Sequence, residues 1–108
     1  MNTLETLAYA INNKLQLTFE YNMPGKVLGT RTGNPHAVFI HISTNNCIVD
    51  VYQIGGVSDK GEPIPGWRQF ILSFIENIEI LESKFEIAED YKSNPQSGRY
   101  NKALFKIT

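Results

Sequence analysis

Two arginines and three ring-bearing side chains are the residues whose chemistry is most informative: Arg31, His36, Tyr52, Trp67 and Arg68. A guanidinium can donate two parallel hydrogen bonds to a phosphate or carboxylate, and an aromatic ring can stack on a base. Together they predict a pocket for an anionic, planar ligand. A structural alternative stays open for two of them. Trp67 could belong to the core, and Arg68 could lay its stem over a sheet with its head in water.

No metal site, cofactor site or catalytic site is predicted. His36, His41 and Cys47 do not form the C-x-x-C or H-x-x-x-H spacing of metal sites. Gly55-Gly56 lacks the following Lys-Ser/Thr of a phosphate-binding loop. The acidic residues that follow residue 75 suit an exposed strand face better than a catalytic carboxylate pair, so a hydrolase is the weakest reading and we expect a protein that is not an enzyme.

The composition describes one domain with one core. The chain has 108 residues, of which 42% are hydrophobic, and a net charge of −1 from 10 basic and 11 acidic side chains. This balance argues against binding of duplex DNA by this chain alone. A polar start, a single cysteine and the lack of a long apolar run predict a cytoplasmic protein without membrane contact.

The elements that must position these side chains are a helix and five strands. Apolar residues at helical spacing predict a helix over Leu4–Ile11, with Asn2 as its cap and Glu5 completing a capping box. One helical turn is expected over Ser73–Asn77. The expected strands are Leu15–Tyr21, Val27–Ile42 with a bend or bulge at Gly33–Pro35, Cys47–Ile54, Trp67–Leu72 and Ile78–Phe85.

Five short strands joined mostly by short turns are typical of a small barrel, because closure hides the sheet edges. We therefore expect a mainly β fold with an N-terminal helix: a five-stranded, SH3-like barrel over residues 1–88, closed or nearly closed. Residues 89–108 are predicted to be a tail that packs on the barrel or at a dimer interface, with Ala103–Ile107 returning as an edge strand or short helix. The predicted core is Leu7, Ile11, Leu17, Phe19, Val38, Ile40, Val49, Val51, Phe70, Leu72, Ile78 and Ile80.

Several segments occur in the order and spacing of a known family. They are Ala8–Tyr21 (AYAINNKLQLTFEY), Arg31–Pro35 (RTGNP), Trp67–Phe70 (WRQF) with Leu72 and Ile75, and the strand end Glu82–Phe85. Over roughly residues 7 to 86 the chain resembles WYL domains, above all short stand-alone members with a Gly/Ser-rich loop before a P-G-W-R segment. The resemblance implies an SH3/Sm-like barrel, a bacterial or phage origin and a ligand-facing arginine at Arg68.

The chain departs from the family in three places. Val51-Tyr52-Gln53 stands where the family has Trp-Tyr-Leu, and Phe74 stands where many members carry a basic residue. The chain is also expected to lack the helix-turn-helix that often precedes the domain. The leading prediction is therefore a non-enzymatic regulatory module that binds a nucleotide or short single-stranded nucleic acid through Arg31, His36, Tyr52, Trp67 and Arg68. The alternative is a module for protein interaction or oligomerisation, with a homodimer formed through an edge strand or the tail.

Overall fold

The chain begins with the predicted helix. The computed structural model describes residues 1–91 and 103–107. Helix α1 spans Thr3–Asn13, and the capping box between Asn2 and Glu5 is confirmed. Lys14 ends the helix in the left-handed conformation, and Leu7, Ala10 and Ile11 are buried. No helix in the described part is long and apolar enough to cross a membrane.

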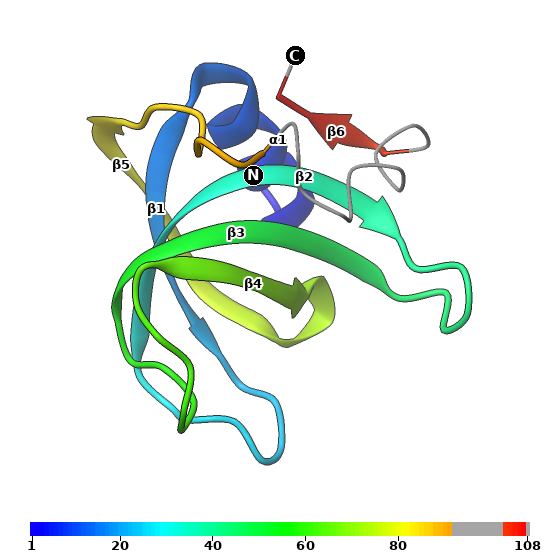
Figure 1. The fold of residues 1–108 in the computed structure, drawn as a ribbon. Coiled ribbons are helices and arrows are strands. Elements are labelled where there is room, and N and C mark those ends of the chain that lie inside the picture. Colours follow the sequence, from blue (N-terminus) through cyan, green and yellow to red (C-terminus); the bar gives the residue numbers. More distant parts are fainter. Residues whose placement is uncertain (92–102, 108) are drawn as a thin grey trace.

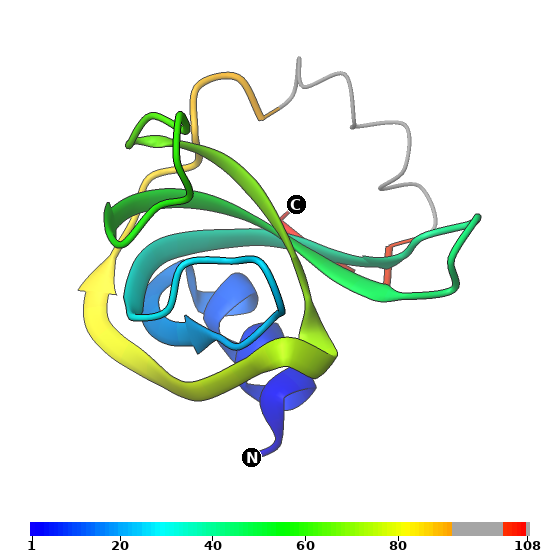
Figure 2. The same cartoon turned by 90° about the horizontal axis from the view of Figure 1, so that it is seen from below.

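An antiparallel sheet curves around the core (Figures 1 and 2). Its elements are β1 (Leu15–Tyr21), β2 (Thr30–Ile40), β3 (Cys47–Gly56), β4 (Gly66–Ile71), the 3₁₀ turn η1 (Leu72–Phe74), β5 (Ile75–Lys84) and β6 (Phe105–Lys106). The strand order is β4-β3-β2-β1-β5, with β6 beside β2. A mainly β domain with one N-terminal helix is confirmed.

The predicted five-stranded barrel, closed or nearly closed, is corrected in two respects, because the described residues form six strands and the sheet is not closed. The turn η1 sends the chain from β4 directly to β5, and β5 then pairs with β1 instead of β4. A side-chain contact nevertheless joins the free edge of β4 to β1, because the Ile71 amide donates to the Tyr21 hydroxyl at 3.0 Å. The Asn22 amide donates to the Phe74 carbonyl at 2.9 Å and so extends the pairing of β1 with β5.

Strand β2 has different partners along its length. The predicted irregularity at Gly33–Pro35 is confirmed, since the register with β3 shifts between Thr32 and Gly33 and again between Pro35 and Ala37. The strand nevertheless runs on through the proline. Its first half pairs with β1, and its second half pairs with β6 at Ala37 and Val38. Two strands thereby share one edge of β2.

Four other predictions are corrected in detail. Strand β2 starts at Thr30 instead of Val27, and the helical turn is shorter than expected, so that β5 already begins at Ile75. Ile40 is 44% exposed because β2 ends there in the turn to β3. Leu72, Ile78 and Ile80 only pack against the core half-buried. The remaining eight predicted core residues are buried: Leu7, Ile11, Leu17, Phe19, Val38, Val49, Val51 and Phe70.

Part of the predicted tail contacts the sheet. Tyr91 is buried, and its hydroxyl donates to the carbonyl of Ile107, which is also buried. Of the two alternatives predicted for Ala103–Ile107, the edge strand is the one found, because β6 pairs with β2. Residues 92–102 and 108 of the tail lie outside the described residues.

Candidate functional site

The five predicted site residues are not gathered in one place. Arg31 is inside the curved sheet, and its side chain is fully buried. Its guanidinium donates to the Val27 carbonyl at 3.1 Å and to Asp59 at 3.3 Å, and lies 5.3 Å from the centre of the Phe70 ring. Arg31 therefore acts as a buried cation that joins two loops, instead of a group that reaches a ligand directly.

His36, Tyr52 and Trp67 form a cluster on the outer face of the sheet. The ring centres of His36 and Trp67 are 4.8 Å apart, and those of Tyr52 and Trp67 are 5.4 Å apart. Tyr91 covers His36 at 5.1 Å, and the Trp67 indole donates to Asp90 at 2.9 Å. This cluster holds residues 85–91 against the sheet. The Trp67 ring therefore has mainly a structural role, which is the alternative left open for it by the sequence.

His36 is neutral in this cluster. Its Nδ1 donates to the Asn34 carbonyl at 2.8 Å, and its Nε2 accepts from the Ala88 amide at 3.1 Å. Burial lowers the pKa of His36 to about 4, although the Asn34 carbonyl and the Asp90 carboxylate act in the opposite direction. A proton on Nε2 would face the Ala88 N–H and break that contact.

Acid should destabilise the fold through His36. Because the folded pKa is below the unfolded value, the unfolded chain binds more protons between pH 6.5 and pH 4. The free energy of unfolding should therefore fall as pH drops through that window, by up to about 1.4 kcal/mol per pH unit for one proton. Urea titrations at several pH values measure this slope. The His36→Gln protein should lose the contribution of His36 to this pH dependence, whereas the His41→Gln protein should keep it. Equal slopes in the wild type and both variants would show that His36 is not the group responsible.

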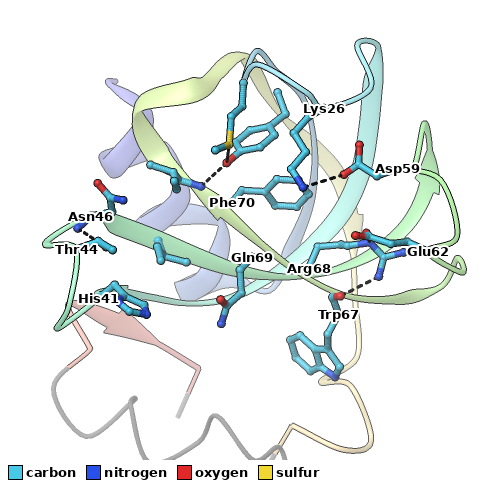
Figure 3. Close-up of a pocket in the computed structure, with 14 residues that line it drawn as sticks. Lys26, His41, Thr44, Asn46, Asp59, Glu62, Trp67, Arg68, Gln69 and Phe70 are labelled. Atoms are coloured by element: carbon cyan, nitrogen blue, oxygen red, sulfur yellow. Dashed lines mark hydrogen bonds and ion pairs between the residues drawn. The ribbon is translucent and has the colours of Figure 1, made fainter.

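A pocket of about 680 Å³ lies over β4, on the opposite side from the Trp67 indole (Figure 3). The surrounding segments are the turn after β1, the turn between β2 and β3, and the loop between β3 and β4. The apolar part consists of Tyr21, Met23, Ile48, Phe70 and Ile71, and Trp67 also borders the pocket although its indole points away from it (Figure 3). The polar and charged part consists of Lys26, His41, Thr44, Asn46, Asp59, Glu62, Arg68 and Gln69.

Arg68 is the predicted site residue whose charged group belongs to this pocket. Its side chain is 11% exposed, and its Nε forms an ion pair with Glu62 Oε2 at 2.5 Å. It also donates to the carbonyls of Trp67 and Pro63. The alternative in which the head of Arg68 lies free in water is therefore wrong, because the group is held by the loop before β4 as well as facing the pocket.

The charged groups around the pocket are paired with one another and carry a small positive excess. Lys26 and Arg68 lie in the pocket wall and Arg31 lies beneath Phe70, while Asp59 and Glu62 are the acids of the lining. The Val27 amide, followed by Arg31 and Lys26, lowers the pKa of Asp59. The three cations thus exceed the two carboxylates by one charge, with the apolar residues close beside them.

Sequence reasoning missed most of this pocket. Lys26 and Asp59 lie in turns and are 3.8 Å apart, although 33 positions separate them in the chain. No local pattern links two such residues. The separation of Trp67 from Arg68 could have been found, because adjacent residues of a strand point to opposite faces of the sheet.

The described residues give no sign of a metal centre, as they contain no group of three or more His, Cys, Asp or Glu side chains placed to hold an ion. Comparison with protein-family models and with curated proteins gives no match for the chain.

Proposed function

We propose that the protein is a non-enzymatic binding module for a nucleotide or the end of a short single-stranded nucleic acid, and that the ligand occupies the pocket over β4. One observation carries this proposal: Arg68 and Lys26 stand beside an apolar floor that includes Phe70 and Tyr21. The volume of about 680 Å³ lies within the usual range for small-molecule sites. The apolar floor suits a base or sugar, and the cations suit a phosphate.

The proposal keeps the family resemblance but changes the site. We propose a WYL-like module of SH3/Sm type, in keeping with the curved antiparallel sheet and the N-terminal helix. Arg68 remains its ligand-facing arginine. Lys26 and His41 take the place of Arg31 and His36, which are both buried. Arg31 contributes only through its charge beneath the floor.

Removal of the Arg68 guanidinium should weaken binding by more than tenfold. A charge-assisted contact is worth roughly 1.5–3 kcal/mol, and the Arg68→Lys protein should recover only part of it because an ammonium lacks the planar fork. Calorimetric titration with AMP and with short oligonucleotides measures the loss. The Lys84→Ala protein, altered on β5 away from the pocket, should bind like the wild type.

Stability must be followed in the same proteins. Arg68 also holds the Pro63 carbonyl and the Ser58 hydroxyl, so the Arg68→Ala protein should lose some unfolding free energy through the loop. Thermal unfolding with and without AMP separates the two effects. An Arg68→Ala protein that still binds AMP like the wild type would contradict the proposal, whatever its melting temperature.

The alternative function, protein interaction or oligomerisation, is favoured by a second hollow. A groove of about 750 Å³ lies between α1 and the segment around β6. Its lining includes Tyr9, Leu104 and Phe105, which are 51%, 48% and 37% exposed, respectively. A second copy of the chain would cover these apolar surfaces. Light scattering of the ligand-free protein distinguishes a dimer of this kind from a monomer.

A further inference from the structure

The guanidinium of Arg68 is engaged by partners within its own chain. Its Nη1 donates to the Trp67 carbonyl, its Nη2 donates to Pro63 and Ser58, and its Nε is paired with Glu62. An arginine binds a phosphate strongly when two of its N–H groups point at two oxygens. A ligand can obtain such a contact only by displacing a partner that Arg68 has within its own chain.

Glu62 is the partner most easily displaced. Its side chain is 40% exposed, whereas the other partners include main-chain carbonyls beside or within β4. The loop that carries Glu62 is fixed at Asp59, which accepts from the Val27 amide at 2.9 Å and pairs with buried Arg31. Between these two acids lie Lys60 and Gly61 at the exposed tip. The Glu62 main chain is held as well, because its amide donates to the Asp59 carbonyl at 3.1 Å and its carbonyl accepts from the Ser58 hydroxyl at 3.0 Å. Displacement therefore moves the Glu62 side chain while the loop stays in place.

Resting on the proposed function, we infer that Glu62 selects ligands with a terminal, dianionic phosphate monoester over phosphodiesters. A carboxylate and a phosphodiester each carry one negative charge, so exchanging one for the other at Arg68 gains little. A phosphate monoester carries about −1.5 to −2 charges at pH 7 and three acceptor oxygens. It can outcompete Glu62 at Arg68, and Lys26 adds a second cation in the same pocket. The ligand class is thus a nucleoside monophosphate or the phosphorylated end of a short strand.

Calorimetric titration with AMP and with 3′,5′-cyclic AMP tests this selection. The wild type should bind AMP about tenfold or more tightly than the cyclic diester, since the ammonium and guanidinium contacts strengthen with ligand charge. The Glu62→Gln protein keeps a hydrogen-bond acceptor but no charge, so cyclic AMP should bind more tightly and the preference should shrink severalfold. The Glu79→Gln protein, with the same loss of charge on exposed β5, should keep the wild-type preference.

Equal affinity for AMP and cyclic AMP in the wild type would overturn the inference and leave the proposed function standing. Failure of the wild type and of Glu62→Gln to bind either nucleotide would overturn both.

Discussion

The Phe70→Ala protein should lose about 4 kcal/mol of unfolding free energy, in the range measured for large core truncations. Phe70 is 3% exposed, and its ring meets Phe19 and Tyr21 edge-on with centres 4.9 and 4.8 Å apart. The Arg31 guanidinium lies 5.3 Å from the ring centre. Truncation leaves a cavity and removes the apolar face of a buried cation. Urea unfolding monitored by circular dichroism measures the loss.

The same substitution should abolish AMP binding, because Phe70 forms part of the pocket floor. The control is Phe105→Ala, which alters a ring that is 37% exposed on β6. That protein should lose much less stability, because a partly exposed ring buries less apolar area, and should bind AMP normally. A Phe70→Ala protein as stable as Phe105→Ala would show that Phe70 is not a central core residue.

The second large effect is expected at Gly56, where an alanine should cost about 3 kcal/mol through overpacking and an unfavourable backbone conformation. Gly56 has a φ of +86°, and an added Cβ would lie 2.2 Å from the Thr30 carbonyl oxygen and 2.7 Å from the Arg31 Cα. Both neighbours are main-chain atoms of β2, opposite which Gly56 is paired. Relief of the clash therefore requires β2 and β3 to separate where Arg31 enters the core.

Gly61 provides the matched control for this prediction. Its φ of +84° is nearly the same, but a Cβ added there meets no atom within 4 Å. The Gly61→Ala protein should therefore lose only the backbone contribution, about 1 kcal/mol. Chemical denaturation of both proteins gives the difference, which isolates the steric part. Equal losses of unfolding free energy at the two positions would mean that β2 and β3 can separate around Gly56 without a measurable cost.

Local patterns predicted the secondary structure well, because the forces that set it act over a few residues. The spacing from Leu4 to Ile11 and the cap at Asn2 specified α1, and strict alternation specified Leu15–Tyr21. The proline at position 35 located the irregularity of β2. Each of these features follows from side-chain period or backbone chemistry within one element.

The site was harder to predict because its contacts join residues far apart in the chain. Burial of Arg31 depends on Asp59, 28 positions later. The burial and hydrogen bonding of the His36 ring depend on Ala88 and Tyr91, which lie 52 and more positions beyond it. An arginine and a histidine in sequence indicate that an anion could be bound, but only these distant partners determine whether the groups are free to bind it.

The pairing of β5 with β1 and of β6 with β2 has a consequence for how the chain reaches this fold. Strands β1 to β4 pair with their neighbours in sequence and can form by local closure. Leu17, by contrast, must meet Ile80, and Ala37 must meet Lys106. Contacts between distant residues require loop entropy to be lost before they stabilise anything, which slows folding. Return of the last two strands, rather than formation of any hairpin, is expected to be the slow event on the way to the native state.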